Sequence, residues 1–436
     1  MMQTIDIREE RPSRAHLATL VPRAATDVSA ATDTAAELIA DVRARGEHAL
    51  VEQAERLDGV RPHHIRVMPD EIAAGVRSLQ PAVREALELA IARVTEATRA
   101  QVPAGTVTPI APGALIVQRW QPVNRVGFYV PGGKAVYPSS VVMNVVPAQV
   151  AGVSSVALAS PPQKAFDGAV HPTILGAAGL LGVDEVYAMG GAGAIGALAY
   201  GVAGLGLDPV DVITGPGNIY VAAAKRLVRG VVGIDSEAGP TEILIIADAT
   251  ADAVLVAADL VSQAEHDELA AAVLVTDSLE LARAVDIEVA RLAASTRHSE
   301  RALTALTGQQ SAIVLVPDLS AAAAFSNAYG PEHLEIQTEN PGAVLDLIES
   351  AGAIFLGSHS PVSLGDYLAG SNHVLPTGGQ SRFSSGLGAY TFLRPQQVIS
   401  YDRSALEAIA PQIVALSLAE DLPAHGDAIT TRFDRS

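Results

Sequence analysis

Residues 185–200 read EVYAMGGAGAIGALAY, and this stretch decides the fold class. A short apolar run rich in β-branched and aromatic residues is followed by glycines and then by an alanine- and leucine-rich run. The pattern predicts a strand, a glycine turn and a helix. The same alternation recurs from residue 113 onward and indicates βαβ units with mostly parallel sheets, covered by helices on both faces. The strand candidates are ALIVQRW, RVGFYV, SVALAS, EVYAMG, DVITG, EILIIAD, AAVLVTD, AIVLVPD and AGAIFLG.

The sequence on either side of this region indicates the domain organisation. Residues 30–100 have a helical, alanine-rich pattern with Glu and Arg at the exposed positions. We therefore expect an α/β protein with two Rossmann-like parallel-sheet domains, a helical N-terminal arm and a helical C-terminal tail. The predicted boundaries are 1–25 for the arm, 127–239 for one α/β domain, 26–126 plus 240–380 for a discontinuous second one, and 381–436 for the tail.

Composition excludes several classes of function. The chain has 436 residues, a net charge of −19 and no cysteine. So acidic a chain repels phosphate and anionic lipid, so neither nucleic acid nor a membrane surface is an expected partner. Without cysteine there are no disulfides, thiolate nucleophiles or Cys-type zinc sites. The N-terminus has no apolar signal region, and the most apolar stretch, 141–160, is interrupted by polar residues, so we expect a cytoplasmic protein.

Four glycine-rich turns are candidate ligand sites. They are Tyr129–Lys134, Gly190–Gly196, Gly215–Asn218 and Ala238–Glu242. The second matches G-x-G-x-x-G through Gly191, Gly193 and Gly196, after a strand and at the start of a helix. Asp211 has the spacing of the acidic residue that usually completes this fingerprint, but it begins its strand instead of ending it. A nucleotide site and a purely structural role in tight turns both stay open.

Polar residues suited to metal binding or acid–base chemistry follow these turns. Gln263 and His266 have i, i+3 spacing, so both should project from one helix face. Glu332 and His333 follow Pro331, at the start of a short element, where a carboxylate beside an imidazole could move protons near neutral pH. Each pair also has a purely structural interpretation. Gln263 and His266 could be a polar pair on the surface. Glu332 could stand at the start of a helix, next to a histidine whose hydrogen bonds are satisfied within the fold.

Two further segments gather polar side chains. Residues 361–373, PVSLGDYLAGSNH, place Asp366 and His373 among small residues, and the near-terminal EDLPAHG carries Glu420 and His425. The first could equally be a polar loop. The second could be an exposed tail, since tail residues complete a site only if the tail folds back or reaches a second subunit.

Taken together, these motifs resemble one known family. The order and spacing of seven segments are similar to histidinol dehydrogenase: GFYVPGGKAVYPSS, GPGNIY, AGPTEI, SQAEHDE, PEHLEI, SLGDYLAGSNHVLPTGG and EDLPAHG, spanning residues 127–426. The resemblance implies a zinc- and NAD-dependent four-electron oxidation of L-histidinol to L-histidine through a bound aldehyde, the last step of histidine biosynthesis. It makes residues 127–239 the NAD-binding domain and the tail a dimerisation segment of a domain-swapped homodimer.

The same resemblance implies roles for individual residues. The zinc ligands would be Gln263, His266, Asp366 and His425, with His425 supplied by the partner subunit. His333 would take the alcohol proton and Glu332 would activate water. The substrate would be bound by Thr241, Gln263, His266, His333, Asp366, His373, Glu420 and His425. NAD would be bound by Tyr129, Gly193 and Asn218.

One position departs from the family. The second glycine turn usually contains a glutamine where this chain has Gly193, so one polar contact to NAD is missing. A net hydrogen bond contributes about 0.5–1.5 kcal/mol, so we expect weaker NAD binding at most.

Two other functions stay open. One is a related zinc and NAD dehydrogenase acting on another small polar alcohol, although no basic residue for a sulfonate stands at the matched positions. The other is a zinc- and nucleotide-binding protein without turnover, against which the intact Glu332 and His333 argue. A purely structural oligomer does not explain the density of polar motifs.

Overall fold

The computed structural model describes residues 1–23, 28–132, 136–237 and 239–433. Parts of the predicted arm, first glycine turn, fourth glycine turn and tail therefore lie outside the described residues. The chain divides into two compact units, Met1–Gln101 with Asn124–Phe392, and Val102–Val123 with Leu393–Ser436.

The larger unit contains a six-stranded sheet that is parallel throughout, in the order β1-β11-β10-β9-β12-β13. Its strands are β1 (Gln3–Asp6), β9 (Glu242–Ala247), β10 (Ala271–Thr276), β11 (Ala312–Leu315), β12 (His333–Gln337) and β13 (Ala353–Leu356). The helices of this part are α1 (Arg14–Leu20), α10 (Ala253–Ala264), α11 (Leu279–Ser295), α12 (Ser299–Thr307), α13 (Leu319–Tyr329), α14 (Pro341–Leu345) and α15 (Val362–Tyr367). Strand β9 lies near the middle of the sheet, so it is buried on both sides.

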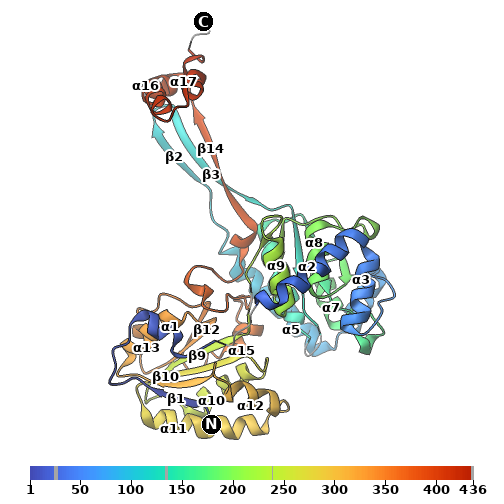
Figure 1. The fold of residues 1–436 in the computed structure, drawn as a ribbon, viewed down its shortest axis with the longest axis vertical. Coiled ribbons are helices and arrows are strands. Elements are labelled where there is room, and N and C mark those ends of the chain that lie inside the picture. The colour runs from blue at the N-terminus through green and yellow to red at the C-terminus, as the bar shows by residue number, and fades with distance from the viewer. Residues whose placement is uncertain (24–27, 133–135, 238, 434–436) are drawn as a thin grey trace. The chain divides into compact units, whose positions relative to one another are not determined.

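Alternation along β9 shows how the helices cover the two faces. Ile243 and Ile245 pack into the core formed with α10, α11 and α12. Leu244 and Ile246 pack into the core on the other face, with residues of α1 and α13. Figure 1 shows α1 and α13 on one side of the sheet and α10, α11 and α12 on the other. A strand buried on both faces has to be apolar at every position, and EILIIA is apolar after its first residue.

The larger unit also holds a five-stranded parallel sheet in the order β6-β5-β4-β7-β8. Its strands are β4 (Arg125–Tyr129), β5 (Ser155–Ser160), β6 (Val186–Ala188), β7 (Val212–Thr214) and β8 (Gly233–Ile234). The connecting helices are α6 (Pro138–Ala151), α7 (Pro172–Leu180), α8 (Gly191–Tyr200) and α9 (Ile219–Val228). The predicted strand–turn–helix of residues 185–200 is therefore confirmed as β6 and α8.

The N-terminal helices belong to this second sheet. They are α2 (Val28–Arg45), α3 (Glu47–Gln53), α4 (Pro69–Ser78) and α5 (Pro81–Arg99). Helix α2 packs on α8 and α9, α4 packs on α7, and α5 packs on α6. We expected these helices to pack on the sheet formed by the strands after residue 240. That prediction is wrong, because they pack on the helices of the five-stranded sheet. Their amphipathic pattern requires an apolar partner but does not say which sheet supplies it.

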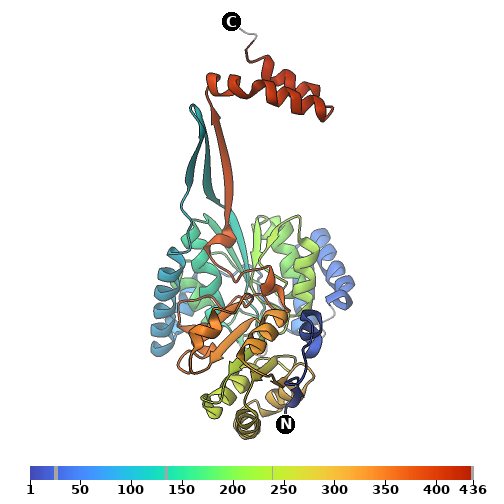
Figure 2. The same ribbon diagram turned by 90° about the vertical axis from the view of Figure 1, so that its left-hand side faces the viewer.

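The smaller unit is built on an antiparallel sheet. Its strands are β2 (Thr106–Ala111), β3 (Ala114–Pro122) and β14 (Leu393–Tyr401), in the order β14-β3-β2. Helices α16 (Arg403–Ala419) and α17 (Pro423–Thr430) follow and pack on each other (Figure 2). The prediction of a helical tail over residues 381–436 is thus wrong in its first part, where nine residues form β14. Likewise the predicted helical arm contains β1, an edge strand of the six-stranded sheet.

All nine predicted strand segments are observed, but the strand that carries His333 was not among them. Residues 333–337 read HLEIQ, and His, Glu and Gln alternate with two apolar residues. All five are buried in β12. His333 and Glu335 have hydrogen-bond partners there, and Gln337 donates through Nε2 while its Oε1 has no partner among the described residues. In the described part of the chain, no helix is long and apolar enough to cross a bilayer.

Candidate functional site

The candidate site lies where β9 and β12 begin. Thr241 directly precedes β9, and Glu332 directly precedes β12. Helix α13 ends at Tyr329 because Gly330 adopts a left-handed conformation with φ 63° and Pro331 cannot continue a helix. We expected all four glycine turns at the carboxyl ends of strands, but the fourth, which leads into β9, opens at the amino end of this sheet.

The carboxyl edge of the five-stranded sheet meets this amino edge. Ser140, in the first turn of α6 after β4, hydrogen-bonds His373 at 3.1 Å. Asn372 donates to the carbonyl oxygen of Met143 at 2.6 Å. The segment of residues 372–373 therefore ties the two sheets together at the site.

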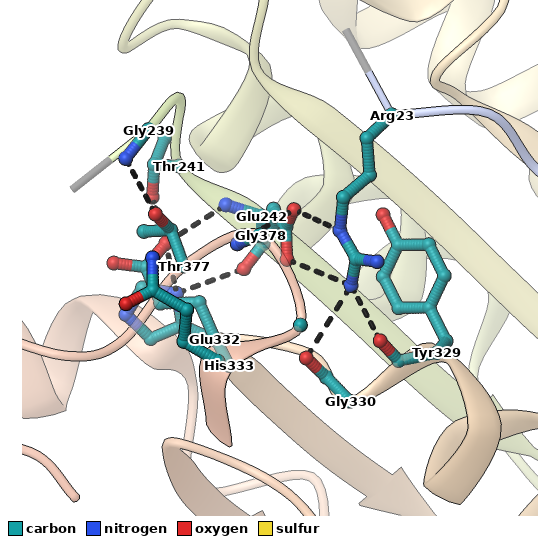
Figure 3. Close-up of polar contacts among 12 residues, drawn as sticks. Arg23, Gly239, Thr241, Glu242, Tyr329, Gly330, Glu332, His333, Thr377 and Gly378 are labelled. Carbon is teal, nitrogen blue, oxygen red and sulfur yellow. Dashed lines mark hydrogen bonds and ion pairs between the residues drawn. The ribbon is translucent and has the colours of Figure 1, made fainter. Parts of the chain in front are cut away.

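A chain of hydrogen bonds connects three of the predicted site residues. Gln263 donates from Nε2 to Thr241 Oγ1 at 2.5 Å. Thr241 donates to Glu332 Oε2 at 2.6 Å (Figure 3). The direction of each bond is set, because an amide nitrogen can only donate and a carboxylate can only accept. The amide oxygen of Gln263 is consequently the end left to bind another group.

The backbone of Glu242 holds both members of the Glu332–His333 pair. Its N–H donates to Glu332 Oε2 at 2.8 Å, and its carbonyl oxygen lies 2.9 Å from His333 Nδ1. A carbonyl only accepts, so Nδ1 carries the proton and Nε2 of neutral His333 has a free lone pair. Both side chains are almost fully buried, with 8% and 5% of their surface exposed.

Burial sets the acidity of Glu332. It raises the pKa of this carboxyl, while nearby His333 and the bonds from Thr241 and Glu242 lower it in part. A buried carboxylate with a raised pKa is a stronger base than an exposed one. The arrangement therefore offers two groups able to accept protons, His333 Nε2 and Glu332.

His266 and Asp366 stand beside this pair. We expected Gln263 and His266 on one helix face, but α10 ends at Ala264 and His266 lies in the turn that follows. Its Nε2 is 4.0 Å from Asp366 Oδ2, a residue of α15. This separation exceeds a hydrogen bond, and both atoms can reach one cation between them.

These donors fit a zinc ion in kind and orientation. Gln263 presents an oxygen whose rotamer is fixed by Thr241, and His266 and Asp366 present nitrogen and oxygen donors. Across the described residues, no group of three or more His, Asp and Glu side chains is gathered for a metal.

His373 is held on both ring nitrogens. Its Nδ1 donates to the carbonyl oxygen of Asp366 at 2.9 Å, which leaves Nε2 to accept from Ser140. Burial lowers the pKa of His373 and favours the neutral ring. A substrate contact through Nε2 would require the Ser140 hydroxyl to turn away.

Glu420 and His425 belong to the smaller unit, at the end of α16 and in α17, and both are exposed. Their side chains are accessible to solvent and could contact another molecule. Nearby, Leu416 and Leu418 are 64% and 61% exposed, which is unusual for leucines on a folded surface.

The residues predicted to bind NAD lie at the carboxyl edge of the five-stranded sheet. Tyr129 is buried at the end of β4, and its hydroxyl accepts from the Gly191 N–H at 3.1 Å. Burial raises the pKa of Tyr129 to about 12. Asn218 is exposed and caps α9 through Oδ1. Gly215, with φ 116°, approaches the carbonyl of Tyr129 so closely that a Cβ would lie 2.0 Å from its oxygen.

Gly193 is buried in the first turn of α8, under the side chain of Gln53. A Cβ at position 193 would lie 2.1 Å from Gln53 Oε1. Gln53 itself is held by the carbonyl oxygen of Leu38 at 3.1 Å. The glycine at this position is thus matched to a glutamine from α3, which fills the space that a side chain at 193 would need.

Comparisons with known proteins agree with this geometry. A family model described as histidinol dehydrogenase matches residues 21–433. This chain belongs to the histidinol dehydrogenase family. The histidinol dehydrogenase of Leifsonia xyli subsp. xyli is 72% identical over 433 residues, covering 99% of both chains. That of Mycolicibacterium smegmatis is 56% identical over 437 residues, covering 100% of this chain and 98% of the other.

A solved structure supports the same conclusion for the fold. The crystal structure of histidinol dehydrogenase from Elizabethkingia anophelis has a TM-score of 0.91 at 33% identity, covering 99% of this chain and 98% of that one. The mixed α/β fold with parallel sheets is therefore confirmed, and the chain is an oxidoreductase of the histidinol dehydrogenase family.

An acidic pair, Glu335 and Asp259, lies next to the site of this histidinol dehydrogenase family member, and no sequence motif indicated it. Glu335, two residues after His333 on the same strand face, accepts from Val362 N–H and Gln337 Nε2, both at 3.0 Å. Gln337 also donates to Asp259 of α10 at 3.3 Å. The cluster joins β12, α10 and α15, the elements that carry or adjoin the site residues. A buried strand with alternating polar residues is the only signal that the sequence offers.

Replacing Glu335 with glutamine is expected to stabilise the protein at alkaline pH. Burial, with the charge of Asp259, raises the pKa of Glu335 to about 8, from 4.5. The folded state then holds a proton that the unfolded state has lost, so wild-type stability falls as pH rises from about 4.5 to 8. Glu335→Gln should remove this slope and gain about 2–4 kcal/mol at pH 8, with little change at pH 4.5.

Denaturant unfolding at pH 4.5, 6 and 8 measures this effect. The exposed Glu85→Gln serves as a control and should follow the wild-type slope. A Glu335→Gln protein that loses stability equally at every pH would show that Glu335 is ionised in the folded state.

Proposed function

We propose that this chain is a zinc-dependent enzyme that oxidises L-histidinol to L-histidine with two molecules of NAD, through a bound aldehyde, as the last step of histidine biosynthesis in the cytoplasm. The observation that carries the proposal is the buried Glu332–His333 pair, held by the backbone of Glu242 beside Gln263, His266 and Asp366. A protein that only binds its ligands has no need of two buried proton acceptors.

His333 is the group that takes the alcohol proton. Its Nδ1–H is fixed on the Glu242 carbonyl, so the free Nε2 lone pair is the base. As the proton reaches Nε2, positive charge develops on the ring, and Glu332 Oε2, 3.4 Å from Nδ1, stabilises it. A nicotinamide held at the proposed NAD edge would supply the hydride acceptor for the carbinol carbon.

Glu332 is the group that activates water against the aldehyde. Its Oε2 is occupied by Thr241 and Glu242, so Oε1 is the oxygen left for water. Because burial raises its pKa, the carboxylate binds a proton readily and becomes a more effective base. The hydrate that forms loses a second hydride and gives the carboxylate. Thr241 therefore positions Glu332 in addition to any contact that it makes with substrate.

Gln263, His266 and Asp366 of one chain, with His425 of a second chain, would hold the zinc ion. Bound there, zinc would supply Lewis-acid chemistry to the substrate. His373 and Glu420 would complete the substrate site. Tyr129 and Asn218 lie at the edge where NAD would bind, and Gly193 would take part through its backbone alone.

A domain-swapped homodimer, with residues 381–436 as its dimerisation segment, is part of the proposal. The smaller unit exposes Leu416 and Leu418 on α16 and Ile399 on β14, which is 66% exposed. A module with so little buried apolar surface needs a partner to cover it. The proposed domains are 127–239 for NAD and 26–126 plus 240–380 for substrate and zinc. The N-terminal helices pack on the five-stranded sheet, β1 falls in the proposed arm, and β2 and β3 belong to the smaller unit.

The direct test is to incubate zinc-loaded protein with L-histidinol and NAD while following NADH absorbance and quantifying histidine. Two NADH per histidine, lost with a chelator and restored by zinc, is the expected result. No NADH at saturating NAD would overturn the assignment and lead to a panel of other polar alcohols. Zinc and NAD binding without any turnover would instead favour the binding-protein alternative.

A further inference from the structure

Arg23 connects the N-terminal arm to the site through two sets of contacts (Figure 3). Its Nε donates to Glu242 Oε1 at 2.5 Å and its Nη2 to Glu242 Oε2 at 3.4 Å. The same Nη2 donates to the carbonyl oxygens of Tyr329 at 2.5 Å and Gly330 at 3.3 Å. The guanidinium also lies 3.9 Å from the centre of the Tyr329 ring. One side chain thus binds both segments that meet at the pair.

Each of these segments controls a catalytic group. Glu242 supplies the backbone N–H that holds Glu332 and the carbonyl that holds His333. Tyr329 and Gly330 form the end of α13, two residues before Glu332. Arg23 therefore fixes the start of β9 against the entry to β12, and the relative position of these two segments determines where both bases point.

Loss of Arg23 is expected to be costly because Glu242 is buried. Only 4% of its side chain is exposed, compared with 24% for Arg23. Burial raises the pKa of Glu242, whereas Arg23 and the Gly378 N–H lower it. Without Arg23 the carboxyl would stay buried with only the backbone donors of Gly378 and Glu332, and it would either take up a proton or move.

A second buried pair in the same unit offers a matched comparison. Arg125 and Glu185 have side chains 14% and 15% exposed and are joined by two hydrogen bonds, one of them 3.0 Å long. Arg125 begins β4 and Glu185 directly precedes β6, so both lie at the amino edge of the five-stranded sheet. Their loss should therefore destabilise the protein without displacing Glu332 or His333.

We propose that Arg23 is a positioning residue that aligns Glu332 and His333 by clamping Glu242 to the end of α13. This inference rests on the proposed function, since it concerns the rate of histidinol oxidation. Arg23 touches neither reacting group, and its effect passes through the backbone of Glu242 and through residues 329–330. A misplacement of about 1 Å in such a site can cost on the order of 100-fold in rate.

The test compares Arg23→Met with Arg125→Met as zinc-loaded enzymes, at a temperature well below both unfolding midpoints. Arg23→Met should lower kcat about 10- to 100-fold, with KM values for histidinol and NAD within about threefold of wild type. Arg125→Met should lower the midpoint but keep kcat. Arg23→Lys should recover only part of kcat, because an ammonium cannot form the same fork of bonds. If Arg23→Met does not fold, the partial loss of kcat in Arg23→Lys provides the test instead.

A double variant separates positioning from neutralisation. Adding Glu242→Gln to Arg23→Met removes the unpaired buried charge, so the unfolding midpoint should recover while kcat stays low. Full recovery of kcat would overturn the positioning role, as would an Arg23→Met enzyme with wild-type kcat and a lowered midpoint. Failure of the wild-type enzyme itself to oxidise histidinol would instead count against the proposed function.

Discussion

Replacing His333 with alanine is expected to lower kcat by about 10²–10⁴, because a positioned general base contributes that much to a proton transfer. The structure gives this residue one available lone pair, on Nε2, since Nδ1–H is held by the carbonyl of Glu242. Zinc content and the KM for NAD should stay near wild type. Steady-state NADH formation and metal analysis of the same preparation measure both.

Glu332→Gln should separate the two halves of the reaction. The amide can still accept from Thr241 and the Glu242 N–H, but it cannot take a proton from water. Oxidation of supplied histidinaldehyde should therefore fall more than formation of the first NADH from histidinol in a single turnover. Equal losses in the two assays would assign Glu332 to a step that both halves share.

His171→Ala is the control for the histidine substitution. His171 caps α7 by accepting from Thr173 N–H, in the other sheet. Its loss should cost about 1 kcal/mol of stability and leave kcat unchanged. A His333→Ala enzyme that is no slower than His171→Ala would exclude His333 as the base.

Removing a proposed metal ligand is expected to have an equally large effect. His266→Ala should abolish bound zinc and lower kcat/KM by about 10³ or more, because a Lewis acid supplies several kcal/mol of transition-state stabilisation. Elemental analysis after dialysis, combined with the NADH assay, measures the two losses. His63→Ala is the matched control, since His63 forms an exposed pair with Asp167 at 3.0 Å and should leave zinc bound.

The same ligands allow a test of subunit sharing. If His425 reaches the site of a second chain, a mixed dimer of one His266→Ala chain and one His425→Ala chain contains one doubly altered site and one intact site. Co-expression with two affinity tags should then recover activity and about one zinc per dimer. A mixed dimer as inactive as its parents would show that each chain completes its own site.

Much of the fold follows from local sequence patterns. Strands such as EILIIA and AAVLVT are continuous apolar runs, which only a sheet covered on both faces can bury. Helix starts follow from residues such as Asp252 and Asn218, which cap α10 and α9. The candidate site residues were also predicted from the sequence, because the order and spacing of its motifs resemble those of a known family.

Tertiary structure decided what local patterns leave open. An amphipathic helix does not specify its partner, so the packing of α2–α5 on the five-stranded sheet was not predictable. Strand β12 alternates buried polar residues with apolar ones, and Glu335 accepts hydrogen bonds there from Val362 and Gln337.

The contacts of Arg23 show the same limit most clearly. They join residues more than 200 positions apart, and neither Arg23 nor Glu242 carries a local signal of the pairing. The sequence by itself determined the fold class, the family and the chemical groups, because these depend on residue types and their spacing. Only the tertiary structure decided which nitrogen of His333 is free, which oxygen of Gln263 and Glu332 is available, and which arginine holds them, because those depend on contacts between distant segments.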